Sequence, residues 1–176
     1  MIMQLKHAIL GLLDIAPQSG YDLGRAFASS VAHFWHADQS QIYRTLDRLE
    51  ADGAITTEHI PQQGKPDRRV HSLTDSGRAE LREWLSGPLD AEQPKEPFLA
   101  RVFFAASTGA DAALQLLDRR EVATLAELAA LRALPRAAED LAAVLRTATL
   151  DAGLRAGEAE LDWIDATRRA IRELEE

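Results

Sequence analysis

Apolar residues recur at helical spacing in two short segments near the start of the chain. Within residues 4–15 they stand three and four positions apart, which predicts an amphipathic helix that ends before Pro17. Ser19 is a residue suited to cap a helix, and two apolar residues four apart follow it. The pattern therefore predicts helices over about residues 4–15 and 21–29, with a turn between them.

The segment from Asp38 to Gly53 predicts a third helix whose two ends are both marked. Asp38 and Gln41 have the spacing of a capping box, in which each side chain bonds to the other residue's backbone N–H. Gly53 suits the left-handed conformation that ends many helices. The apolar stripe of this helix consists of Ile42, Leu46 and Leu49. Polar residues occupy the opposite face.

After Gly53 the period of the pattern changes from helical to alternating. Residues 54–60 and 68–73 are rich in β-branched residues and enclose a turn with Gly and Pro, which predicts a β-hairpin. Thr74 caps a fourth helix, in which Leu81, Trp84 and Leu85 are expected to face inward. The order helix, helix, helix, hairpin, helix predicts a winged helix-turn-helix domain, residues 1–86, with a two-stranded wing.

The second half of the chain is helical in pattern after a proline-containing linker, residues 87–97. A short helix near residues 96–107 is followed by two long ones, residues 110–134 and about 138–175, which are separated by Pro135. The apolar positions of the long helices are Leu114, Leu117, Val122, Leu125, Leu128, Leu131, Leu141, Val144, Leu145, Leu150, Leu154, Leu161, Ile164, Ile171 and Leu174. So few helices do not enclose so much apolar surface. The fold is thus mainly α, and residues 98–176 are expected to form a helical dimerisation domain.

Composition restricts the class of protein and its compartment. The 176 residues include no Cys, which excludes disulfides, thiolate nucleophiles and thiolate metal sites. The N-terminal segment lacks the basic region and cleavage site of a signal peptide. No run approaches the roughly 20 apolar residues of a membrane helix. We expect a cytoplasmic protein with no membrane partner.

The net charge of −8 conceals a local clustering of basic residues. Residues 1–73 carry seven Lys/Arg against eight Asp/Glu, so most of the acidic excess lies in the second half. In the first half Arg44 and Arg48 form one basic cluster, and Lys65, Arg68 and Arg69 form another at the hairpin turn. Affinity for phosphate depends on the local field, so global acidity predicts weak non-specific binding and does not exclude a DNA partner.

The third helix and the hairpin turn together favour DNA binding. On the helix alone, a polar outer face is as well explained by simple solvation. The basic turn follows that helix at the position of a wing, where cations meet the DNA backbone. The predicted DNA-binding residues are Gln39, Ser40, Gln41, Tyr43, Arg44, Lys65, Arg68 and Arg69. The first five would lie in or beside the major groove and the last three along the phosphates.

These segments resemble the PadR family of bacterial regulators. The family pattern has a Gly-Tyr-x-Leu helix start, a Trp before the recognition helix, an Ile-Tyr-x-x-Leu-x-x-Leu-Glu-x-x-Gly helix and a Gly-Lys-Pro-x-Arg-Arg wing that ends in Leu-Thr-x-x-Gly. The matching residues here are Gly20–Leu23, Trp35, Ile42–Gly53, Gly64–Arg69 and Leu73–Gly77. The second half, including EPFLARVFF, is similar to the virulence-activator-like C-terminal domain of longer family members.

The resemblance implies a homodimer that pairs through its C-terminal helices. It places two recognition helices in successive major grooves of a palindromic operator, and it implies a repressor that releases DNA when a small molecule binds. The position of Asp38 is commonly Ser or another small polar residue in relatives. A carboxylate there still caps the helix, but it repels a nearby phosphate.

Several further residues have two interpretations. Phe98, Phe103, Phe104 and Trp163 either line an effector pocket or form part of a dimer core. Tyr21 is expected to pack against the third helix in preference to contacting an operator, and Trp35 to pack as a core wedge. His33 and His36 lack a further ligand at metal-binding spacing, so neither a metal nor a cofactor is expected.

The enzyme class is excluded by the lack of a suitable motif. The chain has no phosphate-binding glycine loop and no recognisable Ser–His–Asp nucleophile arrangement. Two alternatives to a PadR-type regulator stay open from the residues: a winged-helix module that binds proteins, and a winged-helix regulator of another dimeric family. The basic clusters oppose the first, and the long C-terminal helices oppose the second.

Overall fold

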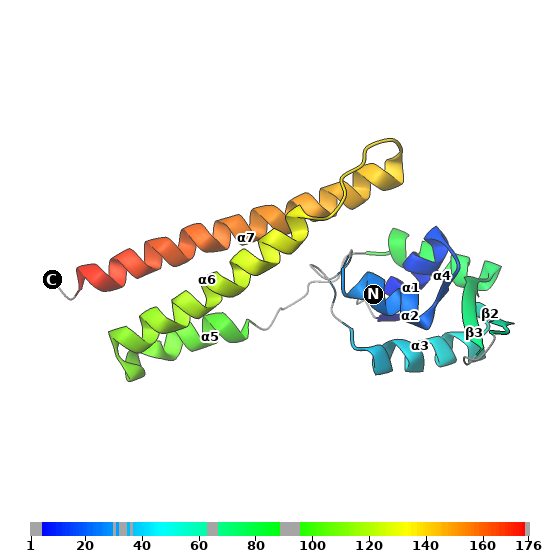
Figure 1. Cartoon of the computed structure of the whole chain (residues 1–176), viewed down its shortest axis with the longest axis horizontal. Coiled ribbons are helices and arrows are strands. Elements are labelled where there is room, and N and C mark those ends of the chain that lie inside the picture. The colour runs from blue at the N-terminus through cyan, green and yellow to red at the C-terminus, as the bar shows by residue number, and fades with distance from the viewer. Residues whose placement is uncertain are drawn as a thin grey trace. The chain divides into compact units, whose positions relative to one another are not determined.

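The computed structural model describes residues 5–29, 31, 35, 37–62, 67–88 and 96–174. They belong to two compact units, Met1–Gln93 and Pro94–Glu176 (Figure 1). Both units are dominated by helices, which confirms the mainly α fold. In the described residues no helix is both long and apolar enough to cross a membrane.

The first unit is a winged helix-turn-helix with one strand more than predicted. Its elements are α1 (Leu5–Ile15), β1 (Gln18–Ser19), α2 (Gly20–Phe27), α3 (Gln39–Ala51), β2 (Ile55–Ile60), β3 (Arg68–Leu73) and α4 (Asp75–Ser86). The antiparallel sheet has the order β1-β3-β2, so the predicted two-stranded wing is part of a three-stranded sheet. Gln18 pairs with His71, and Ser19 pairs with Val70. A strand of two residues has no alternating pattern, and for that reason the sequence did not predict it.

The predicted capping residues begin the helices. Ser19 and Asp22 form a capping box at the start of α2, and Asp38 and Gln41 form another at the start of α3. Ser19 serves both β1 and α2 because a capping residue has the extended backbone of a strand. Gly53, with φ of +71°, follows α3 as predicted.

A single apolar core joins the helices of the first unit to the sheet. Its buried residues are Ile9, Leu10, Leu12, Leu13, Leu23, Phe27, Ile42, Leu46, Leu49, Ala54, Ile55, Leu73 and Leu81. Trp35 and Trp84 pack against it, as predicted, and the ring of His7 stacks on that of Trp84 with centroids 4.9 Å apart. Leu85 was wrongly predicted to face inward: 66% of it is exposed, because α4 presents only one narrow face to the core.

The second unit is a helical hairpin with a short helix at its start. It consists of α5 (Pro97–Phe104), a 3-10 helix (Ala105–Thr108), α6 (Ala110–Arg132) and α7 (Leu141–Glu173). Helices α6 and α7 lie side by side and run in opposite directions (Figure 1). Leu128, Leu131, Leu150 and Leu154 form the core between them. A Cβ on Gly157 would come within 2.8 Å of the Leu128 side chain, so this glycine permits the close approach of the two helices.

Much of the apolar surface that the pattern assigned to the interior of the second unit is exposed. The exposed residues of α6 and α7 include Val122, Leu125, Leu141, Val144 and Leu145, and Leu174, directly after α7, is exposed as well. Helix α5 has no buried residue. Two packed helices share only one seam, and the other apolar positions therefore lie outside it within the described residues.

We predict that Gly77→Ala destabilises the first unit by about 1–3 kcal/mol. Gly77 is buried in the first turn of α4, and a Cβ there would overlap the backbone carbonyl oxygen of Ala54. Gly11→Ala is the matched control, because a Cβ at Gly11 meets no atom within 4 Å and Ala favours a helix by up to about 1 kcal/mol. In urea unfolding followed by circular dichroism, the urea midpoint should be lower for Gly77→Ala and unchanged or higher for Gly11→Ala. Equal midpoints for the two variants would contradict the packing.

Candidate nucleic-acid interface

The outer face of α3 exposes most of the polar residues that the sequence pattern placed there. Ser40, Gln41, Arg44 and Arg48 are all exposed, opposite the buried Ile42, Leu46 and Leu49 stripe. Arg44 Nε donates to the carbonyl oxygen of Ser40 at 3.3 Å. Among the described residues no ion pair is found for Arg44 or Arg48, and both side chains lie on the exposed face of α3.

Asp38 adds a negative charge at the start of α3. Its Oδ1 accepts hydrogen bonds from the Ser40 hydroxyl at 2.7 Å and from the Gln41 backbone N–H at 2.8 Å. These bonds, with that of Ser40 the strongest, lower the pKa of Asp38. The carboxylate is therefore ionised near neutral pH and opposes any phosphate that approaches this turn.

Gln39 and Tyr43 lie toward α2. Gln39 Nε2 donates to the Gly20 carbonyl oxygen at 3.2 Å. A Cβ on Gly24 would overlap the Gln39 amide, and a Cβ on Gly20 would overlap the Tyr43 ring. The two glycines therefore form a flat surface on α2 against which these side chains set the position of α3.

Tyr21 differs from its prediction. It was expected to pack against the third helix, but 64% of it is exposed, and Tyr43 occupies the surface beside Gly20 instead. Tyr21 lies in the first turn of α2, close in sequence to the Ser19 cap. The exposure favours the other interpretation of Tyr21, a contact with DNA, over packing against the third helix. The Gly-Tyr pair was its signal, read as packing.

Two arginines tie the wing to the helix-turn-helix. Arg68 Nη2 lies 2.7 Å from Asp22 Oδ2 on α2. Arg69 Nη2 lies 2.9 Å from Glu50 Oε2, and its Nη1 lies 3.6 Å from Asp47 Oδ1, both on α3. Both arginines were predicted to contact the phosphates of DNA, and in this structure each has an acidic partner within the first unit. Lys65, the third predicted wing cation, lies outside the described residues.

The acidic partners are held in their charged forms. The Ser19 hydroxyl and then Arg68 lower the pKa of Asp22, which also accepts the backbone N–H of Ser19. A hydrogen bond from Thr57, together with the charge of Arg69, lowers the pKa of Glu50. Ion pairs of partly exposed groups contribute only about 0–1 kcal/mol each, so they orient the wing more than they stabilise it.

His71 lies beneath this network in the centre of the sheet. It is 2% exposed, and its Nδ1 lies 3.0 Å from the Thr57 hydroxyl. Burial, and then the nearby charge of Arg69, lower the pKa of His71. The ring is therefore neutral near neutral pH, and Thr57 connects it to Glu50 on the recognition helix.

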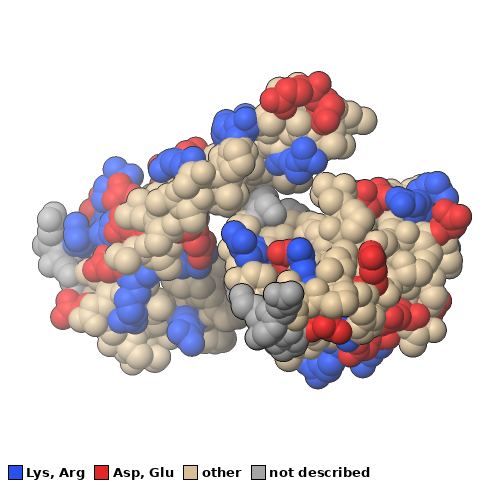
Figure 2. All heavy atoms as spheres, turned by 45° about the vertical axis from the view of Figure 1, so that its right-hand side comes forward, with Lys and Arg blue, Asp and Glu red and all other residues tan. Residues whose placement is uncertain are grey.

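Acidic and basic side chains are interspersed over the surface. Figure 2 shows both signs on the face in view, with no continuous basic area, as expected for a net charge of −8. Within the described residues no group of three or more His, Asp or Glu is placed to hold a metal ion. His33 and His36 lie outside those residues.

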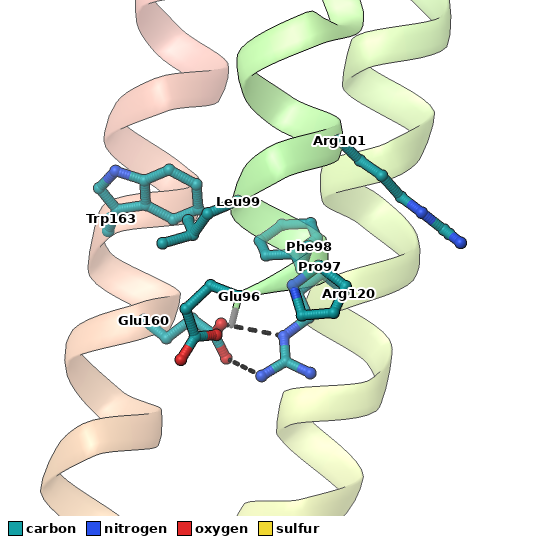
Figure 3. Close-up of a pocket in the computed structure, with 8 residues that line it drawn as sticks. All are labelled: Glu96, Pro97, Phe98, Leu99, Arg101, Arg120, Glu160 and Trp163. Carbon is teal, nitrogen blue, oxygen red and sulfur yellow. Dashed lines mark hydrogen bonds and ion pairs between the residues drawn. The ribbon is translucent and has the colours of Figure 1, made fainter. Parts of the chain in front are cut away.

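The four aromatic residues predicted for an effector site do not share one pocket. Phe98 and Trp163 meet edge to face, with ring centroids 6.0 Å apart, and line a pocket of about 650 Å³ (Figure 3). Phe104 lines a separate pocket of about 520 Å³. Phe103 is 80% exposed and contacts Phe104. The Phe98–Trp163 pocket contains charged residues of both signs, whereas the charged residues that line the Phe104 pocket are Arg101 and Arg119.

Comparison with known proteins decides the family. Residues 9–83 match the transcriptional regulator PadR-like family, and residues 94–172 match the virulence activator alpha C-terminal family. "Probable transcriptional regulator Rv1176c" of Mycobacterium tuberculosis is 35% identical over 191 residues, which cover 97% of this chain and 99% of that protein. The chain belongs to the PadR-like family of transcriptional regulators. As a member of this family it is a regulator and not an enzyme.

Solved PadR structures support the same assignment. Bacillus subtilis PadR in complex with operator DNA is 30% identical, with a TM-score of 0.80 over 95% of this chain and 98% of that one. The same protein in complex with p-coumaric acid is 28% identical, with a TM-score of 0.75 over 96% and 98%. In sequence, this "Negative transcriptional regulator PadR" is 40% identical over 102 residues, which cover 57% of this chain and 56% of that protein. The PadR resemblance is thereby confirmed.

We predict that the stability of the first unit falls as the pH drops from 7 to 5.5. Since the pKa of His71 is lowered in the folded state, the unfolded chain takes up the proton first below the usual value of about 6.5. Stability is thus complete above that pH and is lost below it, at up to about 1.4 kcal/mol per pH unit for one histidine. The lowered carboxylate pKa values of Asp22, Asp38 and Glu50 act only at more acidic pH.

The pH dependence is measured by urea unfolding at pH 7, 6.25 and 5.5. His71→Gln should flatten it, whereas His59→Gln, at an exposed position of β2, should leave it unchanged. The pKa of His7 is also lowered, mainly by burial. Part of the pH dependence of stability should therefore remain in His71→Gln. An unaltered slope in His71→Gln would contradict the assignment.

Proposed function

We propose that this PadR-family chain binds operator DNA sequence-specifically through the outer face of α3. The observation that supports this is the exposure of Arg44 and Arg48, next to exposed Ser40 and Gln41, on a helix whose other side is buried in the core. Polar side chains near the start of such a helix reach base edges in the major groove. Bacillus subtilis PadR, a relative of the same fold, has been solved in complex with operator DNA, which supports a DNA partner for this chain.

The predicted DNA-binding residues then divide by role. Ser40, Gln41 and Arg44 read base edges. Gln39 and Tyr43 position α3 by packing against Gly24 and Gly20 of α2, and the exposed part of Tyr43 lies near the DNA backbone. The remaining three, Lys65, Arg68 and Arg69, contact phosphates, Arg68 by exchanging its Asp22 partner and Arg69 while also holding the wing on α3.

We further propose a homodimer that acts on a palindromic operator. The exposed apolar residues of α5, α6 and α7 supply a surface that a second copy would cover. In this arrangement residues 1–86 form the DNA-binding domain, 87–97 the linker and 98–176 the dimerisation and effector domain. The protein would act in the cytoplasm.

We propose that the regulator is a ligand-responsive repressor. The negative regulator PadR of B. subtilis is a relative, and its structure with p-coumaric acid supports a small-molecule effector for this chain as well. Phe98 and Trp163, in the pocket of the second unit, are the proposed effector contacts. Phe103 and Phe104 would then belong to the dimer surface.

We predict that Arg44→Ala and Gln41→Ala each weaken binding to the selected operator by about 1–3 kcal/mol and relax preference at particular base pairs. Binding is measured by fluorescence anisotropy on a duplex selected from a random pool by the unaltered protein, against a scrambled duplex. Arg82→Ala is the matched control. Arg82 belongs to α4, which is separated from the proposed reading helix α3 by α1 (Figure 1). Equal losses on both duplexes would assign these residues to phosphates, and no loss would refute the proposed reading face.

We predict that Arg68→Ala weakens binding to every duplex by a similar factor and reduces the salt slope by about one. Asp22→Asn should act in the opposite direction, because it releases Arg68 and removes a carboxylate, and the gain should shrink in an Arg68→Ala background. Affinities are measured between about 50 and 200 mM salt, a range over which phosphate contacts change the affinity by orders of magnitude. An unchanged slope in Arg68→Ala would restrict this residue to holding the wing.

A further inference from the structure

The pocket in the second unit combines aromatic walls with carboxylates. It is formed by the start of α5 together with α6 and α7, and its volume of about 650 Å³ lies in the range of small-molecule sites. Figure 3 shows Phe98 and Trp163 near Leu99, with Arg120, Glu160 and Glu96 beside them. These side chains converge from three helices, so the pocket depends on the folded unit and not on one segment.

Arg120 is already fully engaged by the protein. Its Nε lies 2.9 Å from Glu160 Oε1, and its Nη2 lies 2.8 Å from Glu160 Oε2, a bidentate pair. Its guanidinium carbon lies 5.6 Å from the centre of the Phe98 ring, within cation–π distance. Thr124 donates to the same carboxylate at 2.7 Å. Arg120 is therefore not placed to receive the carboxylate of an anionic ligand without loss of this pair.

Carboxylates outnumber the guanidinium group at this end of the pocket. Burial would raise the pKa of Glu160, but hydrogen bonds from Arg120 and Thr124 outweigh burial and lower it, so the group is ionised. Glu127 Oε1 lies 4.0 Å from Arg120 Nη1, and the charge of Glu96 also acts on Arg120. Arg101 lines the pocket but extends away from the aromatic pair (Figure 3). At this end of the pocket the carboxylates of Glu96 and Glu160 therefore lie beside one guanidinium group, that of Arg120.

We propose that this pocket binds an organic cation with an aromatic or apolar body. The charged nitrogen would lie near Glu96 and Glu160, and the body would pack on Trp163, Phe98 and Leu99. Aromatic faces attract cations, and carboxylates in partly buried surroundings do so more strongly than in water. The inference deepens the proposed function by naming the chemical class of its effector, and its test does not depend on DNA.

The test compares tyramine with p-coumaric acid, which carry the same hydroxyphenyl ring and opposite charges. Isothermal titration calorimetry of the full chain at pH 7 should give tyramine at least about tenfold tighter binding, equivalent to about 1.4 kcal/mol. Glu96→Gln and Glu160→Gln should each remove most of that preference. Glu158→Gln, on an exposed part of α7 and paired with Arg132, is the matched control and should retain it.

Three outcomes would overturn the proposal. Tyramine does not bind at millimolar concentration, p-coumaric acid binds as tightly or more tightly, or both carboxylate variants keep the tyramine affinity of the unaltered protein. The Glu96 side chain makes no cap hydrogen bond at the start of α5, so Glu96→Gln tests the charge while the backbone bond from the Ala100 N–H to the Glu96 carbonyl oxygen is retained. The same preparations are assayed without ligand for operator binding. Failure of the pocket with intact operator binding separates this inference from the proposed function.

Discussion

The burial of Ile42, Leu46 and Leu49 is the constraint on which the rest of the first unit depends. A buried Leu or Ile contributes about 2–5 kcal/mol when measured by truncation to Ala, whereas a partly exposed ion pair contributes about 0–1 kcal/mol. The apolar stripe therefore decides which face of α3 points to solvent. Contacts at the flanks of α3 then adjust the position of this already oriented helix. Gln39 and Tyr43 pack against α2, and Glu50 pairs with Arg69.

The sequence predicted the features that depend on neighbouring residues and on the helical spacing of apolar positions. The caps at Ser19 and Asp38, the end of α3 at Gly53 and the buried stripe of α3 each involve residues within a few positions of one another. Strand β1, the exposure of Tyr21 and the partners of Arg68 and Arg69 are long-range features. They depend on which segment the sheet brings to α2 and α3, and a count of charges along the chain contains no such information.

The second unit shows the limit of helical periodicity in a different way. The pattern marked apolar positions all along α6 and α7, but an isolated pair of helices buries only the positions at its common seam. Val122, Leu141 and Leu145 lie on helix faces turned by more than about 100° from Leu128 and Leu150, and they are exposed. Periodicity thus identifies residues that require cover without naming what covers them. The proposed homodimer would supply that cover from a second copy.

The distribution of charge bears on how an acidic protein selects a DNA site. Non-specific affinity comes mostly from phosphate contacts, and here Asp38, Asp22 and Asp47 lie near the very cations that would make them. Those carboxylates reduce the attraction of any duplex, whatever its sequence. They do not reduce the hydrogen bonds that Gln41 or Arg44 would form with a matching base edge. A lower background of non-specific binding increases the ratio of specific to non-specific affinity, and that ratio, more than the affinity itself, determines how well a regulator finds its operator among competing sites.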